Sequence, residues 1–198
     1  MQKKDLINSL KAQKFPEKII NAFEKIPREG FVPEEHKKFS YEDIPLPIGY
    51  QQTISQPYTI AFMLTLLEVK DKQKILEVGS GSGYVLALLS QLCKNGKIFG
   101  IERIKELADS SKEKLKNYKN VKLIHGDGSK GLLKEAPFDR ILVSAASNEI
   151  PQKLVMQLKP RGILVAPVRN SIIVFKKINA EGKIKEYTGF SFVPLVEE

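Results

Sequence analysis

The stretch Leu76-Glu77-Val78-Gly79-Ser80-Gly81-Ser82-Gly83-Tyr84 decides the fold of this chain. It closes a short apolar run, Lys74–Val78, and opens a segment with apolar residues at helical spacing, Tyr84–Leu92. Glycines between a strand and a helix permit a sharp turn and let the backbone approach a ligand, and the free N–H groups of the helix favour an anion. The loop therefore predicts a ligand-binding turn at the end of a parallel strand.

The spacing of the glycines separates this loop from the dinucleotide fingerprint, Gly-x-Gly-x-x-Gly. Here the third glycine, Gly83, comes one residue early, and an acid, Glu77, precedes the loop. The pattern resembles the first motif of class I methyltransferases, in which the acid faces the positively charged amino acid half of S-adenosylmethionine. The alternative is a tight turn without a ligand.

Two further strand ends carry acidic residues. Glu102 ends the next apolar run, roughly 20 residues beyond the glycines, where an acid can accept hydrogen bonds from ribose hydroxyls. Gly126-Asp127-Gly128 ends the third run, and in class I methyltransferases an acid there often contacts the adenine amino group. Taken alone, Glu102 could be a helix N-terminal acid and Asp127 an ordinary loop residue. In series they indicate a cofactor site at the carboxyl edge of a sheet.

Strands and helices alternate from residue 58 onward, which predicts a parallel sheet with right-handed crossovers. The expected helices are 58–69, 84–92, 105–117 and 151–158, and the expected strands are 74–78, 97–101, 121–124, 140–144 and 163–168. The tail differs, because apolar runs at 172–178 and 185–193 flank the turn 179–182 and predict an antiparallel hairpin.

The N-terminal part has another character. Apolar residues at helical spacing over 5–26 predict two helices divided at Phe15-Pro16, and a proline-rich connector, expected to be irregular, follows from Pro27 to Pro57. We therefore expect one α/β domain, 1–198, with a doubly wound, mostly parallel, Rossmann-like sheet. Its parts are a helical cap with a substrate loop (1–57), a cofactor-binding core (58–168) and C-terminal antiparallel strands (169–198).

The composition further narrows the possible classes of protein. The 198 residues are 42% hydrophobic and lack a run of about 18 apolar residues, so no spanning helix is expected. The net charge of +9 favours either a solvated basic surface or an anionic partner, and the lysines are scattered among glutamates. The lone Cys93 excludes an internal disulfide, and the N-terminus does not resemble a signal peptide, so we expect a cytoplasmic protein. His36 and His125 are isolated, so no metal site is expected.

The connector holds two hydroxyl residues, Thr53 and Ser55, just before a helix. Ser55 could cap that helix, or the hydroxyls could hold a substrate carboxylate beside the cofactor. The fourth strand ends in Ser144-Ala145-Ala146-Ser147 and lacks the Asn/Asp-Pro-Pro-aromatic motif of many base amino-methyltransferases. The sequence thus lacks the residues that usually accompany methylation of nucleic acid bases.

Several segments together resemble the protein-L-isoaspartate O-methyltransferase family, in order and over nearly the whole chain. They are Arg28-Glu29-Gly30-Phe31-Val32-Pro33, 45–57, 75–84, Glu102-Arg103-Ile104, Gly126-Asp127-Gly128, Ala136-Pro137-Phe138-Asp139 and Phe192-Val193-Pro194-Leu195. The resemblance implies an enzyme that uses S-adenosylmethionine, yields S-adenosylhomocysteine and methylates the free α-carboxylate of L-isoaspartyl residues in unfolded or aged proteins. Activity on D-aspartyl residues stays open.

The resemblance also implies the roles of particular residues. Ser55 matches the residue assigned to the active site, and the substrate contacts fall on Thr53, Ile54 and Val193. The cofactor contacts fall on Glu77, Gly79, Ser80, Gly81, Gly83, Glu102, Asp127 and Gly128. We expect a monomer without a nucleic acid or membrane partner. The rival hypotheses are a methyltransferase acting on RNA and a non-catalytic cofactor-binding module.

Three positions depart from the family pattern. Gln51 stands where many members have the second glycine of Gly-x-Gly-Gln-Thr, and Arg169 replaces the glycine common after Pro-Val. Tyr58 stands where some members have histidine. These departures bear on peptide preference and not on the reaction.

Overall fold

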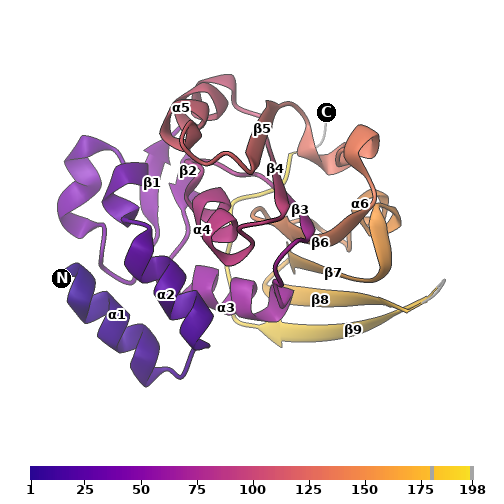
Figure 1. The fold of residues 1–198 in the computed structure, drawn as a ribbon, viewed down its shortest axis with the longest axis horizontal. Helices are drawn as coiled ribbons and strands as arrows, with labels where there is room; N and C mark the ends of the chain where they lie inside the picture. The colour runs from indigo at the N-terminus through magenta and orange to yellow at the C-terminus, as the bar shows by residue number, and fades with distance from the viewer. Residues whose placement is uncertain (179–180, 197–198) are drawn as a thin grey trace.

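The computed structural model describes residues 1–178 and 181–196 and contains one large, mostly parallel sheet (Figure 1). Its seven strands lie in the order β5-β4-β3-β6-β7-β8-β9. The strands from β5 to β7 are parallel, whereas β8 and β9 are antiparallel to their neighbours. This confirms the predicted fold class. The strands are β3 (Lys74–Val78), β4 (Lys97–Glu102), β5 (Val121–His125), β6 (Phe138–Val143), β7 (Leu158–Val168), β8 (Ser171–Ile178) and β9 (Glu181–Thr188).

Helices cover both faces of this sheet because side chains alternate along each strand. Along β3, Ile75 points into the larger core, and its neighbour Leu76 points into a second, smaller one. The larger core packs against α3 (Pro57–Leu67), α4 (Tyr84–Leu92) and α5 (Lys105–Leu115), and the smaller one against α6 (Gln152–Met156). The N-terminal helices α1 (Lys3–Ala12) and α2 (Glu17–Lys25) form an outer layer, in which α2 contacts α3 and α4 (Figure 1).

The connector between α2 and α3 is more regular than expected. It contains the 3-10 turns η1 (Arg28–Phe31) and η2 (Glu34–Phe39), and then a small hairpin of β1 (Leu46–Gly49) and β2 (Gln52–Ile54). The expectation of an irregular segment was therefore wrong. Proline argues against a central strand, but a two-stranded hairpin has only edges, where proline is tolerated.

Two boundaries in the C-terminal half also differ from prediction. β7 begins at Leu158 and not at residue 163, so α6 is shorter than the expected helix. β9 covers Glu181–Thr188 and not 185–193, because Gly182 pairs with Lys177 inside the ladder. A Cβ on Gly182 would lie 2.0 Å from the ring of Phe175, so this glycine serves close packing between strands. The rest of the predicted turn, 179–180, lies outside the described residues.

Candidate active site

The glycine loop after β3 takes the left-handed backbone that its sequence predicts. Gly79, Gly81 and Gly83 have φ angles of +77°, +50° and +84°. The N–H groups of Gly79 and Ser80 donate to the carbonyl of Ile101 at 2.9 and 3.1 Å, which ties the loop to β4. The Ser80 side chain is buried behind the loop. A Cβ on Gly83 would lie 2.9 Å from Leu115 Cδ1, so the close packing of α5 against the loop also requires glycine at this position.

Glu102 lies at the end of β4 and supports the glycine loop directly. Its carboxylate accepts hydrogen bonds from the N–H groups of Gly81, at 2.8 Å, and Ile104, at 2.9 Å. The side chain is 6% exposed and lines a cleft beside the loop. The acid thus fixes the shape of the loop and also faces the space where a ligand would lie.

Glu77 is buried at the end of β3 beneath the loop. One oxygen, Oε1, accepts a hydrogen bond of 2.8 Å from Ser144 Oγ. The other, Oε2, is buried and has no hydrogen-bond partner within the described part of the chain. Burial raises the pKa of Glu77 to about 8; the Ser144 hydrogen bond lowers the pKa, and the Glu102 carboxylate raises it. A buried, unpartnered carboxylate oxygen fits a ligand that brings a cationic group to this place.

The cleft has a volume of about 420 Å³ and is formed by neighbouring strand ends and the β1–β2 hairpin. Gly128, after β5, lines it, and a Cβ there would lie 2.5 Å from Val78 Cγ1. The Asp127 carboxylate accepts from the N–H of Ser129 at 2.8 Å and lies 3.2 Å from Lys130 Nζ. The structure therefore shows Asp127 shaping this turn, and its contact with adenine stays a prediction.

A second cavity, of about 340 Å³, adjoins the cleft. Thr53, Ser144 and Val193 line both spaces. Charged side chains are absent from the described lining of the second cavity, which is rich in hydroxyl groups. The lining consists of Pro45, Thr53, Ser55, Gln56, Thr59, Ser144, Ser191, Phe192 and Val193. The cleft and the second cavity thus share lining residues and lie side by side, so ligands in the two spaces would be close to each other, as group transfer requires.

Ser55 is not the cap of α3. The N-cap residue is Gln56, and its side chain does not cap the helix. Asp43 Oδ1 instead accepts from the N–H of Tyr58 in the first turn, at 2.8 Å. The capping hypothesis for Ser55 was therefore wrong, and its half-buried side chain faces the second cavity. The adjacent Ile54 is buried, so it holds the end of β2 against the core.

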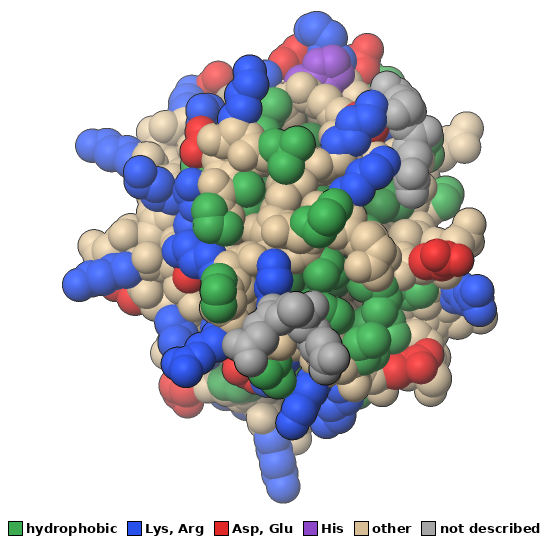
Figure 2. Space-filling view, turned by 90° about the vertical axis from the view of Figure 1, so that its right-hand side faces the viewer, with side chains coloured by type: hydrophobic (Ala, Val, Ile, Leu, Met, Phe, Trp, Pro, Cys, Tyr) green, Lys and Arg blue, Asp and Glu red, His purple; other side chains and the backbone are tan. Residues whose placement is uncertain are grey.

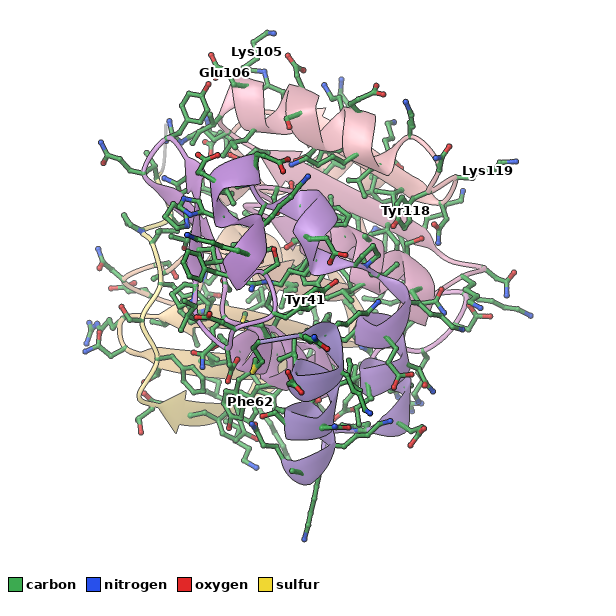
Figure 3. All side chains as sticks on the ribbon, turned by 90° about the vertical axis from the view of Figure 1, so that its left-hand side faces the viewer. Tyr41, Phe62, Lys105, Glu106, Tyr118 and Lys119 are labelled. Carbon is green, nitrogen blue, oxygen red and sulfur yellow. The ribbon has the colours of Figure 1, made fainter. Side chains whose placement is uncertain are left out.

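Arg28 is a residue whose role the sequence did not predict. Its buried guanidinium donates to the carbonyls of Ser40 at 2.7 Å, Ile44 at 3.1 Å and Ser55 at 3.1 Å. Burial lowers the pKa of Arg28 to about 10, so the group stays charged. Figure 3 faces this connector, with Tyr41 near its centre. Arg28 gathers distant turns of the connector around the backbone of Ser55. Its place in the family-like segment 28–33 was the available signal.

The C-terminal segment closes the site from the other side. The carbonyl of Val193 accepts from the N–H of Ala146 at 2.8 Å, and the N–H of Leu195 donates back to the Ala146 carbonyl at 2.7 Å. The segment after β9 therefore runs across the strand ends (Figure 1). This contact holds Val193 where it lines both the cleft and the second cavity.

Two absences hold for residues 1–178 and 181–196. None of the helices there is long and apolar enough to cross a membrane. No cluster of His, Cys, Asp or Glu in these ranges could hold a metal ion.

A Rossmann-like sheet, a glycine loop and acids at successive strand ends define a class I methyltransferase fold. The family profile of protein-L-isoaspartate(D-aspartate) O-methyltransferase matches residues 1–198. The chain belongs to this family.

Relatives support this assignment over most of the chain. The chain is 48% identical over 185 residues to protein-L-isoaspartate O-methyltransferase 2 of Archaeoglobus fulgidus, covering 90% of this chain and 84% of the relative. It is 43% identical to the enzyme of Methanococcoides burtonii, covering 96% and 98%.

Solved structures agree with the sequence relatives. One protein-L-isoaspartate O-methyltransferase superimposes with a TM-score of 0.91 at 25% identity, covering 99% of this chain and 66% of that one. A putative family member from Plasmodium falciparum, solved with S-adenosyl-L-homocysteine, gives a TM-score of 0.87 at 27% identity and full coverage of both chains.

Proposed function

We propose that this chain transfers the methyl group of S-adenosylmethionine to the free α-carboxylate of L-isoaspartyl residues in damaged proteins, yielding a methyl ester and S-adenosylhomocysteine. The observation that carries the proposal is that the two spaces adjoin and share lining residues. The cleft lined by the glycine loop and Glu102 adjoins a hydroxyl-lined cavity, and Thr53, Ser144 and Val193 line both. Family membership supports the same reaction.

The residues of the cleft, and Glu77 in a small pocket beneath the glycine loop, fit the cofactor. When bound, S-adenosylmethionine supplies an electrophilic methyl group on a sulfonium. Glu77 would face its ammonium group, since Glu77 Oε2 is buried without a partner among the described residues. Glu102 would accept hydrogen bonds from the ribose hydroxyls, and the glycine loop and Gly128 leave room for the ligand. Asp127 would contact the adenine amino group.

The second cavity fits a carboxylate that needs no activation. A carboxyl group with a pKa of about 4 is ionised at pH 7, so no general base is required. The hydroxyls of Thr53 and Ser55 would hold and orient it, which is the main demand of a direct displacement. Val193 would form part of the surface against which the peptide lies, and the buried Ile54 would support it by fixing the end of β2.

Charge does not favour RNA as the substrate. On the face shown in Figure 2, acidic side chains lie among more numerous basic ones. Lys105 and Glu106 are neighbours and both project into solvent from the first turn of α5 (Figure 3). A phosphate backbone is bound by concentrated positive charge.

We also propose that the enzyme is monomeric and cytoplasmic. Its partners would be isoaspartyl peptides and unfolded or aged proteins, without a nucleic acid or membrane partner.

A methyl-transfer assay tests this function against both rivals. The protein is incubated with labelled S-adenosylmethionine and either an isoaspartyl peptide or an RNA pool. We expect label on the peptide that is lost at mildly alkaline pH, as methyl esters are. Alkali-stable label on RNA would support an RNA methyltransferase, and cofactor binding without transfer would support a non-catalytic module.

A further inference from the structure

The tip of the β1–β2 hairpin presents an aromatic side chain to the cofactor cleft. Gly49 pairs with Gln52, so Tyr50 and Gln51 form a two-residue turn. Among the described residues that line the cleft, Tyr50 is the one aromatic, and it is 55% exposed. A large ring held in water beside a ligand cleft gains apolar contact when a ligand arrives.

The backbone of this turn is strained. Tyr50 and Gln51 have φ angles of 54° and 58°, in the left-handed region. Two-residue hairpin turns of this kind strongly prefer Asn-Gly or Gly-Gly, which adopt it at low cost. Non-glycine residues in such conformations persist where the surrounding structure fixes them, and they cluster at ligand clamps. The turn therefore carries a large side chain at a position where glycine or asparagine would adopt the backbone conformation at lower energetic cost.

The hairpin is fixed against the glycine loop. Ile48 is buried, and its Cδ1 lies 3.1 Å from the position that a Cβ on Gly81 would take. The N–H of Gly81 in turn donates to Glu102, the acid proposed to bind the ribose. Tyr50 and Glu102 line the same cleft, so the fixed hairpin holds its tip beside the part of the cleft proposed to bind the ribose.

We propose that Tyr50 is a cofactor-binding residue whose ring packs on the adenosine half of the bound cofactor and covers it from solvent. This inference rests on the proposed function. Adenosine is common to S-adenosylmethionine and S-adenosylhomocysteine, so Tyr50 should contribute equally to both. A ring above the sulfonium would instead favour S-adenosylmethionine through a cation–π interaction.

Calorimetry with both ligands tests the proposal on the full chain. We expect Tyr50→Ala to raise Kd about tenfold for both ligands, and Tyr50→Phe to stay within about twofold because the ring remains. Leu133→Ala removes another exposed apolar side chain, away from the cleft lining, and should leave Kd unchanged.

The outcomes separate this inference from the function on which it rests. Absence of binding by the unmodified protein would contradict the cofactor assignment itself. Normal binding by both the unmodified protein and Tyr50→Ala would overturn the role of Tyr50. A larger loss for S-adenosylmethionine than for S-adenosylhomocysteine would overturn the adenosine contact. An effect confined to the peptide KM at saturating cofactor would overturn the role as well. Melting temperatures should be unchanged in Tyr50→Ala, since the side chain is exposed.

Discussion

Ser55 is the residue on which the catalytic proposal depends most. The structure removes its competing role as a helix cap, so the Ser55→Ala variant should keep its melting temperature. We expect turnover with an isoaspartyl peptide to fall at least about tenfold, equivalent to about 1.4 kcal/mol of barrier. Thermal unfolding and initial rates on the same preparation check this. A destabilised variant that keeps full activity at low temperature would contradict it.

Glu77 should couple stability to pH in the cofactor-free protein. Burial raises its pKa from the ordinary 4.5 to about 8, so the folded chain holds a proton that the unfolded chain has released. The stability contributed by this proton is fully present below pH 4.5 and is lost as pH rises through 8. Relative to Glu77→Gln, the wild type should therefore lose stability between pH 5 and pH 8, by up to about 1.4 kcal/mol per pH unit.

Denaturant unfolding at several pH values measures this difference. Parallel curves for the two proteins would show that Glu77 does not hold the proton. The same variant should bind S-adenosylmethionine more weakly at pH 8, because a neutral amide cannot pair with an ammonium group. Greater stability together with weaker binding distinguishes a ligand-facing acid from a structural one.

At the scale of elements, the connector is where prediction from the sequence stopped short. The alternation of strands and helices from residue 58 predicted a parallel sheet with antiparallel strands at one edge, since apolar periodicity is a strong signal in buried strands. The hairpin β1–β2 gave a weak signal because its turn, Tyr50-Gln51, lacks the glycine usual at left-handed positions. Arg169 is a similar case, with a φ of 52° at a position where glycine is common in the family pattern.

The same reasoning predicted some residues of the site and missed others. Glu77, Glu102 and the glycines follow strands whose ends must meet at one edge, so the sequence could bring them together. The contacts of Arg28 with Ser40 and Ser55 depend on long-range folding of the connector, which no periodicity encodes. The boundary between β8 and β9 was misplaced because Gly182, which suggests a turn, serves strand packing.

Arg28 tests whether the connector positions the substrate residues. Arg28→Lys keeps the charge but cannot reach the carbonyls of Ser40, Ile44 and Ser55 together, so we expect the free energy of unfolding to fall by roughly 1–3 kcal/mol. In the folded fraction, the KM for the peptide should rise while the affinity for S-adenosylmethionine stays near wild type. Equal losses for peptide and cofactor would indicate a purely structural role.

At the scale of the whole molecule, the connector and the C-terminal segment line both spaces, whereas the strand ends and the glycine loop line mainly the cleft. An isoaspartyl residue presents its carboxylate one carbon nearer the main chain than an aspartyl residue does. A site that fixes the peptide backbone and aligns one carboxylate can therefore separate the two by reach alone.

The most direct test of this account compares one isoaspartyl peptide with its aspartyl twin of identical sequence. Misplacement of a reacting group by about 1 Å can cost on the order of a hundredfold in rate. We therefore predict that initial methylation rates will favour the isoaspartyl peptide by at least about a hundredfold, with an ester label that is lost at mildly alkaline pH. Equal rates for the two peptides would contradict the account and leave only the methyltransferase fold in place.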